Sequence, residues 1–153
     1  MKTLILGLGN PLLGDDGVGW SVANQVRLRV ASPDTEVDCL AGGGLSLMER
    51  LVGYDRAVIV DALTTQRAPV GTVTCFDLDQ VPDPVAGHLS SAHETSLKTA
   101  LRLGMSLGMS LPTVVKVVAI EAQQVYDFSE ELSPAVGAAV PEAVRLIVDL
   151  GWL

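Results

Sequence analysis

Three polar residues at the edges of apolar segments are the best candidates for chemistry in this chain. Asp16 lies in a glycine-rich stretch near the N-terminus, Asp61 ends an apolar run, and His93, one of only two histidines, precedes a predicted helix. Imidazole nitrogen favours nickel, zinc or copper, and carboxylate oxygens neutralise part of the charge of a divalent ion. Two carboxylates and one imidazole together predict a site for a divalent metal of borderline softness.

Each of these residues also has a simpler structural interpretation. Either Asp15 or Asp16 can cap the helix that follows them, and Asp61 can bind the backbone of the next loop. A lone histidine such as His93 is more often structural, and His88, in a stretch rich in proline and glycine, has the weaker context. Only a shared location of the three residues favours the metal site over these alternatives.

The familiar motifs of hydrolases and nucleotide-binding proteins are absent. The chain has no GxSxG sequence, residues 93–97 do not read HExxH, and the glycines of residues 7–19 are not spaced as GxGxxG. Cys39 and Cys75 form no CxxC pair and lie in predicted strands. These absences argue against the standard hydrolytic arrangements and against a dinucleotide site.

Strands and helices alternate along the chain. Residues 57–60 form a continuous apolar run, typical of a strand buried on both faces of a parallel sheet. The other predicted strands cover residues 3–8, 36–41, 71–77 and 114–120, and the predicted helices cover residues 18–30, 45–52, 95–109 and 135–150. This alternation predicts an α/β fold with helices on both faces of an open sheet. Ligands bind outside the carboxyl ends of the strands in such sheets, and the three candidate residues are expected at this edge.

Length and composition narrow the remaining classes. At 153 residues the chain fits a single domain over residues 1–153. The formal net charge is −8 and the Lys and Arg residues are scattered, which argues against a nucleic-acid partner. The apolar stretches are shorter than the roughly 20 residues that span a bilayer, and two cysteines without a pairing pattern fit a reducing compartment. We therefore expect a cytoplasmic protein that does not associate with membranes.

Several motifs taken together resemble one known family, the hydrogenase maturation endopeptidases or HybD-like peptidases. The resemblance covers nearly the whole chain, although each motif alone is weak. The matching segments are residues 6–10 (LGLGN), 15–19 (DDGVG), 42–43 (GG), 60–62 (VDA), 91–94 (SAHE) and 132–136 (LSPAV).

This resemblance implies a fold, an activity and a site. The implied fold is a single-domain, three-layer α/β/α structure with a mostly parallel, twisted five-stranded sheet. The implied enzyme is an endopeptidase, a metal-dependent hydrolase that removes the C-terminal extension of a nickel-iron hydrogenase large-subunit precursor after nickel insertion. By resemblance, Asp16, Asp61 and His93 are its catalytic and metal-binding residues, and Gly42 and Gly43 bind substrate. The nickel is implied to arrive with the precursor.

Two departures from the family pattern bear on substrate specificity more than on the core activity. Many members carry an aspartate directly before the paired glycines, where this chain has Ala41. An accessory role of that carboxylate is therefore absent here or shifted to Asp38. Many members also carry Gly-Val-x-Pro after the last strand, where this chain has Ala-Ile-Glu-Ala at residues 119–122.

Two other functions remain open from the sequence. Residues 7–11 (GLGNP) also resemble the start of peptidyl-tRNA hydrolases, but that family needs a histidine shortly after this run and a basic surface, and this chain has no histidine before His88. A non-catalytic nickel- or nucleotide-binding module on the same kind of sheet would also lack protease motifs. Stabilisation by a nucleotide, or tight nickel binding without peptidase activity, would identify such a module.

Overall fold

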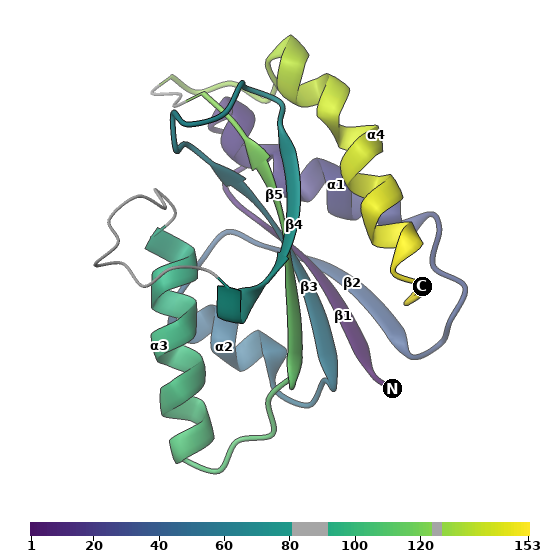
Figure 1. The fold of residues 1–153 in the computed structure, drawn as a ribbon, viewed down its shortest axis with the longest axis vertical. Coiled ribbons are helices and arrows are strands. Elements are labelled where there is room, and N and C mark those ends of the chain that lie inside the picture. The colour runs from purple at the N-terminus through teal and green to yellow at the C-terminus, as the bar shows by residue number, and fades with distance from the viewer. Residues whose placement is uncertain (81–91, 124–126) are drawn as a thin grey trace.

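Five strands form one mostly parallel sheet in the computed structural model, which describes residues 1–80, 92–123 and 127–153 (Figure 1). The strand order is β2-β1-β3-β5-β4; β4 runs antiparallel to β5, and the other neighbours are parallel. The strands are β1 (Thr3–Leu8), β2 (Thr35–Leu40), β3 (Arg56–Leu63), β4 (Val73–Asp77) and β5 (Val114–Glu121). The predicted α/β fold with a mostly parallel five-stranded sheet is confirmed.

Helices cover both faces of the sheet and complete the three predicted layers (Figure 1). One face carries α1 (Val18–Arg27) and α4 (Pro134–Asp149), and the other carries α2 (Leu45–Leu51) and α3 (Ala92–Ser106). Two short 3-10 helices, η1 (Gly14–Gly17) and η2 (Leu78–Gln80), follow β1 and β4. In the described part of the chain, no helix combines the length and the apolar character needed to cross a membrane.

Strand β3 shows how the sequence builds a core on each face. Ala57 and Ile59 pack in the cluster beneath α2 and α3, whereas Val58 and Val60 pack in the cluster beneath α1 and α4. None of these four side chains is more than 1% exposed. Successive strand residues face opposite sides of a sheet. A continuous apolar run is therefore what a strand covered on both faces requires.

The spacing of valines explains the packing of α1 and where it stops. Val18, Val22 and Val26 recur every fourth position, so they share one helix face, and all three are fully buried against the sheet. The predicted helix extended to residue 30, but α1 ends at Arg27, and residues 28–29 form a turn that leads the chain back toward β2. The valine pattern outlasts the helix because the chain must reverse to form the next strand.

Two glycines allow α1 to lie close to the sheet. A Cβ atom on Gly19 would lie 2.4 Å from the carbonyl oxygen of Leu8 and 2.5 Å from that of Val60. A Cβ atom on Gly7 would lie 2.3 Å from the carbonyl oxygen of Gly19. The start of α1, with η1 directly before it, is thereby held against the ends of β1 and β3.

Two predicted boundaries are wrong next to candidate residues. β3 does not end at Asp61 but continues to Leu63, because residues 61–63 pair in register with residues 119–121 of β5. α3 begins at Ala92 instead of residue 95, so His93 lies in the first turn of the helix rather than before it. Pairing with a neighbouring strand carries β3 past a polar residue that, in the sequence alone, looks like a strand end.

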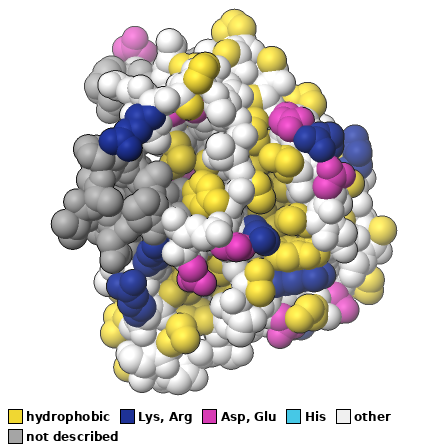
Figure 2. Space-filling view, viewed as in Figure 1, with side chains coloured by type: hydrophobic (Ala, Val, Ile, Leu, Met, Phe, Trp, Pro, Cys, Tyr) yellow, Lys and Arg dark blue, Asp and Glu magenta, His cyan; other side chains and the backbone are white. Residues whose placement is uncertain are grey.

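The molecular surface mixes charged and apolar side chains. On the face shown in Figure 2, basic side chains are dispersed among acidic and hydrophobic ones and do not gather into one patch. Several are paired with acids, as Arg145 is with Glu142 and Asp149 on α4. The absence of a nucleic-acid partner stays a prediction.

Candidate functional site

The parallel strands β1, β3 and β5 end at the same edge of the sheet, and the candidate site lies there. Asp16 belongs to η1, the next element after β1, which contacts β3, and Asp61 lies near the end of β3. Helix α3, with His93 in its first turn, covers one face of the sheet and runs toward the opposite edge, where residues 107–113 lead into β5 (Figure 1). The fold thus brings the segments that carry Asp16 and Asp61 into contact and places α3 over the same sheet.

The adjacent carboxylates of Asp15 and Asp16 face different parts of the molecule. Asp15 is only 1% exposed, and its two oxygens accept hydrogen bonds from the backbone N–H of Ser133 at 2.7 Å and from its hydroxyl at 2.8 Å. Asp16 is partly exposed, and its Oδ2 accepts a hydrogen bond from the backbone N–H of Asn10 at 2.8 Å. Asp15 therefore binds the start of α4, while Asp16 remains within the loop after β1. A metal-binding role for Asp16 stays a prediction.

Asp61 is a buried carboxylate on the face of the sheet that α2 and α3 cover. It is 2% exposed, and its Oδ1 accepts a hydrogen bond from the backbone N–H of Ala62 at 2.9 Å. Its neighbours two positions away, Ile59 and Leu63, both pack in the core cluster beneath α2 and α3. Strand alternation gives Asp61 the same direction. A carboxylate is costly to bury unless it is bonded or paired, so its place in the core marks a specialised position.

The side chain of His93 lies outside the described part of the structure, although its backbone is part of α3. Among the described side chains, no three His, Cys, Asp or Glu groups form a cluster that could hold a metal ion. The three-residue metal site of Asp16, Asp61 and His93 thus stays a prediction that the described side chains do not test. The other histidine, His88, falls outside the described residues altogether.

The paired glycines lie in the loop between β2 and α2. Gly42 and Gly43 are partly exposed, and the next residue, Gly44, has φ of +58°, a conformation that favours glycine. The loop thus needs glycine for its backbone shape at one position and leaves main-chain atoms accessible at the others. Substrate binding by Gly42 and Gly43 stays a prediction.

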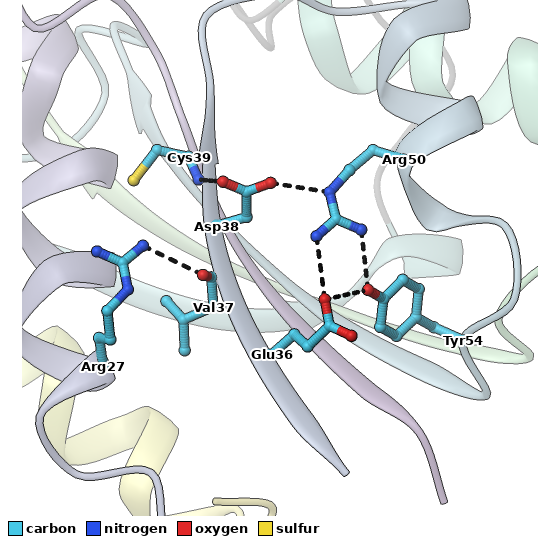
Figure 3. Close-up of polar contacts among 7 residues, drawn as sticks. All are labelled: Arg27, Glu36, Val37, Asp38, Cys39, Arg50 and Tyr54. Carbon is cyan, nitrogen blue, oxygen red and sulfur yellow. Dashed lines mark hydrogen bonds and ion pairs between the residues drawn. The ribbon is translucent and has the colours of Figure 1, made fainter. Parts of the chain in front are cut away.

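Asp38 belongs to a polar network that joins β2 to α2 (Figure 3). Its Oδ2 accepts a hydrogen bond from Nε of Arg50 at 2.9 Å, and its Oδ1 accepts one from the backbone N–H of Cys39 at 2.8 Å. Arg50 also donates to the hydroxyl of Tyr54, which donates to Glu36 at 2.7 Å. The hydrogen bond from Arg50 is the main cause that lowers the pKa of Asp38. Both oxygens of Asp38 are engaged within this network, which weakens the idea that Asp38 replaces the carboxylate missing at Ala41.

The surroundings of both cysteines disfavour the thiolate form. Partial burial raises the pKa of the Cys39 thiol and that of the Cys75 thiol above the ordinary value. The thiolate is the reactive form of cysteine, so a raised pKa lowers the reactive fraction at neutral pH. Both cysteines are in strands, as expected, and neither forms a disulfide.

Glu121 is another buried carboxylate at this edge, and in the sequence it stands out only as part of a departure from the family pattern. It is 6% exposed, its Oε2 accepts a hydrogen bond from the backbone N–H of Thr65 at 2.9 Å, and its Oε1 is bonded to the Thr65 hydroxyl. Glu121 pairs in register with Leu63, so it follows Asp61 along the same face of the sheet. The signal that singled out Asp61, an acid at the end of an apolar strand, applies equally to Glu121.

Comparisons with known proteins agree on one family. A family model described as hydrogenase maturation protease (HycI) matches residues 21–150, a range that includes Asp61 and His93 and begins after Asp16. The chain is 32% identical over 84 residues to the hydrogenase 2 maturation protease of Escherichia coli, an alignment that covers 54% of this chain and 51% of that protein. It is 28% identical over 151 residues to a putative hydrogenase maturation protease of Methanocaldococcus jannaschii, covering 95% and 93% of the two chains.

Solved structures give the same result for the fold. The hydrogenase maturating endopeptidase HybD from E. coli superimposes with a TM-score of 0.80 at 24% identity, covering 98% of this chain and 91% of that one. A nickel-iron hydrogenase maturation protease, HybD from Thermococcus kodakarensis, superimposes with a TM-score of 0.75 at 28% identity, covering 98% and 99%. The match to the E. coli curated protein spans about half of that protein's length, whereas the structural matches span almost all of both chains.

Proposed function

Because the chain belongs to the hydrogenase maturation protease family, we propose that it is an endopeptidase that removes the C-terminal extension of a nickel-iron hydrogenase large-subunit precursor after nickel insertion. The observation that carries this proposal is the arrangement at the carboxyl edge of the sheet. There, η1 with Asp16 contacts β3 with Asp61, and α3 with His93 covers the face toward which Asp61 points. This is the edge at which open α/β sheets bind their ligands.

In this proposal, nickel is part of the substrate. Asp16, Asp61 and His93 complete the coordination of a nickel ion that the precursor already holds through its cysteines. One imidazole nitrogen and two carboxylates suit nickel chemically and offset part of its charge. Such an ion can polarise the scissile carbonyl or a water molecule as a Lewis acid. Cleavage then depends on metal loading, and a protein without a conventional nucleophile still acts as a peptidase.

The burial of the two carboxylates supports an approach of the substrate from the η1 side. Asp16 is partly exposed, whereas Asp61 is 2% exposed and already bonded to the backbone of Ala62. A protein-bound metal would therefore meet Asp16 at the surface and Asp61 deeper within the edge. The accessible loop of Gly42 and Gly43 is proposed to contact the main chain of the precursor. We place the reaction in the cytoplasm, where free cysteines are usual.

The nickel dependence is tested with the purified chain and a large-subunit precursor prepared with and without nickel. We expect mass spectrometry to show loss of the C-terminal peptide from the nickel-loaded precursor alone, because only that form presents the metal to the site. Equal cleavage of both forms would refute nickel recognition and leave the peptidase activity standing. Tight nickel binding by the isolated chain, with cleavage of neither form, would support a nickel-binding module instead.

The site residues are tested by two substitutions with matched controls. Asp16→Asn keeps the size of the side chain but removes its charge, and His93→Ala removes the imidazole, so each should abolish cleavage of the nickel-loaded precursor while circular dichroism stays unchanged. Asp34→Asn, at an exposed acid away from the edge, and His88→Ala, at the only other histidine in the sequence, should cleave like the unmodified protein. Full activity of Asp16→Asn or His93→Ala would place the site elsewhere.

A further inference from the structure

Asp15 joins the loop after β1 to a helix that is distant in the sequence. Both of its carboxylate oxygens bind Ser133, which is 118 positions away and is the N-cap residue of α4. The donors are the backbone N–H and the hydroxyl of the same serine, at 2.7 Å and 2.8 Å. Asp15 is 1% exposed, so these two bonds satisfy a carboxylate that water scarcely reaches.

Ser133 is used in an uncommon way for an N-cap serine. An N-cap hydroxyl ordinarily accepts a hydrogen bond from a backbone N–H in the first turn of its own helix. The hydroxyl of Ser133 makes no such capping bond and instead donates to Asp15. The serine at this position thus serves the contact with the loop rather than its own helix. The negative charge of Asp15 also lies at the positive end of α4, where the helix dipole favours it.

Further bonds from the segment before α4 extend the contact along the loop. The N–H of Gly14 donates to the carbonyl of Ser129 at 2.7 Å, and the N–H of Ser129 donates to the carbonyl of Leu12 at 2.8 Å. Leu13 and Ser129 form an isolated parallel bridge. Residues 12–15 are therefore held against residues 129–133 by main-chain bonds, and Asp15 adds the side-chain bonds at one end.

The orientation of Asp16 depends on how η1 is held. Its Oδ2 accepts the N–H of Asn10 at 2.8 Å, and its own N–H donates to the carbonyl of Leu13 at 3.2 Å. Its carbonyl oxygen lies so close to Gly9 that a Cβ atom there would sit only 1.9 Å away. The backbone of η1 is therefore in close contact with the chain that follows β1. A shift of η1 would move the Asp16 carboxylate with it.

We propose that Asp15 is a positioning residue: by binding Ser133 at the start of α4, it fixes η1 so that Asp16 presents its carboxylate to the substrate-bound metal. The inference rests on the function proposed above and deepens it, since it assigns different roles to the two adjacent acids. Asp15 contributes no charge to the metal, because its oxygens are committed to α4. Asp16 alone supplies the carboxylate from the loop.

The experiment compares Asp15→Asn, Ser133→Ala and Ser133→Thr in the full chain. Asparagine at position 15 removes the charge and replaces one of the two acceptor oxygens with an NH2 group, which cannot accept a hydrogen bond from Ser133. Alanine at position 133 keeps the backbone donor and loses the hydroxyl, whereas threonine keeps both. The control is Glu130→Gln, which removes a charge from an exposed side chain in the segment before α4.

With nickel-loaded precursor, we expect kcat to fall about ten- to a hundredfold in Asp15→Asn and KM to change little, because a misplaced group mainly costs transition-state stabilisation. Ser133→Ala should lower kcat by a smaller factor, and Ser133→Thr and Glu130→Gln should match the unmodified protein. The Asp15→Asn and Ser133→Ala effects should be non-additive in the double variant, because both remove one contact. Additive effects, or an unchanged kcat in a folded Asp15→Asn protein, would overturn the proposal.

Amide hydrogen exchange separates this proposal from the proposed function. Exchange at residues 10–17 should accelerate in Asp15→Asn and Ser133→Ala while exchange in β1 and β3 stays unchanged. This result is expected whether or not the unmodified protein cleaves any precursor, so an inactive protein would refute the function and still test the contact. Unchanged exchange at residues 10–17 would show that Asp15 does not order η1.

Discussion

Three buried carboxylates at the carboxyl edge of the sheet share one property: each accepts a backbone N–H. Asp15 accepts from residue 133, Asp61 from residue 62 and Glu121 from residue 65. Hydrogen bonds to charged groups contribute more than those between neutral groups, about 1.5–3 kcal/mol each. Two of these acids bind loops at this edge, since Asp15 binds the segment before α4 and Glu121 binds the segment after β3. Asp16, which is partly exposed, lies in η1 beside Asp15.

Loss of Glu121 should loosen the loop after β3. Glu121→Ala removes both hydrogen bonds to Thr65. The N–H and hydroxyl of Thr65, which is partly buried, then lose these acceptors. We expect the free energy of unfolding, measured with urea, to fall by about 1–3 kcal/mol. Glu131→Ala, at an exposed acid, is the control and should change it little. An equal effect of the two substitutions would show that the Thr65 contact adds no stability.

At the residue scale, local sequence pattern indicated the candidate acids, but only the family resemblance distinguished Asp16 from Asp15. Asp15 and Asp16 are adjacent and chemically alike, and what separates them is Ser133, whose position next to the loop depends on the completed fold. The sequence suggested no role for Glu121, which stands out only because residues 119–122 depart from the family pattern. Its partner, Thr65, lies 56 positions away. A side chain's partner across the fold cannot be read from local pattern.

At the scale of elements, the network around Arg50 fastens helix α2 to the edge strand β2. Arg50 lies on α2 and binds Asp38 and Glu36, two residues of β2 (Figure 3). The Gly42–Gly44 loop connects these two elements, so the network fixes both ends of the loop proposed to contact substrate. The acids are 47% and 59% exposed, and ion pairs this open contribute little, about 0–1 kcal/mol.

The stability that this network contributes should disappear in acid. The bond from Arg50 lowers the pKa of Asp38, and the bond from the Tyr54 hydroxyl, followed by that from Arg50, lowers the pKa of Glu36. A carboxyl group with a lowered folded-state pKa contributes stability above its unfolded pKa and loses it as pH falls through the folded value. The difference in unfolding free energy between the unmodified protein and Arg50→Gln should therefore be largest near neutral pH and shrink as pH falls below the unfolded pKa values of Asp and Glu, about 4.

The control for this pH profile is Arg29→Gln, which removes an exposed charge just beyond α1 and outside the network. Its effect on the unfolding free energy should vary less between neutral and acid pH than that of Arg50→Gln. Urea unfolding followed by circular dichroism at each pH measures both. A constant difference for Arg50→Gln across the range would mean that packing of its side chain, rather than its bonds to the acids, stabilises the link.

The order and type of the elements followed from hydrophobic periodicity, because each strand and helix must bury an apolar face. The run of residues 57–60 identified the central strand, and the valines of α1 identified its buried face. Boundaries next to the candidate site were less predictable. β3 extends beyond Asp61 because it pairs with β5, a strand that is distant in the sequence. Backbone hydrogen bonding between distant segments thus sets the end of β3, which the local polarity of the sequence did not predict.

At the scale of the whole molecule, the close approach of α1 to the sheet connects the fold to the site. Gly19 lies where α1 meets the carbonyl groups of β1 and β3, and η1 with Asp16 directly precedes that helix. The close contact that sets the distance between α1 and the sheet thus lies next to η1, which carries a candidate site residue. A change in this separation should affect stability and cleavage together.

Gly19→Ala tests this coupling. The added Cβ would lie 2.4 Å and 2.5 Å from two backbone carbonyl oxygens, which cannot rotate away as a flexible side chain could. We expect the unfolding free energy to fall by about 1–3 kcal/mol and cleavage of nickel-loaded precursor to fall with it, even at temperatures where the variant is fully folded. The matched control is Gly137→Ala in α4, where the added Cβ would make an ordinary contact of 3.9 Å with the Cβ of Leu132. That substitution should stabilise the protein by up to about 1 kcal/mol, since alanine is the better helix former. If a folded Gly19→Ala protein cleaved at the normal rate, the position of α1 would set the stability of the layers without setting the geometry of the site.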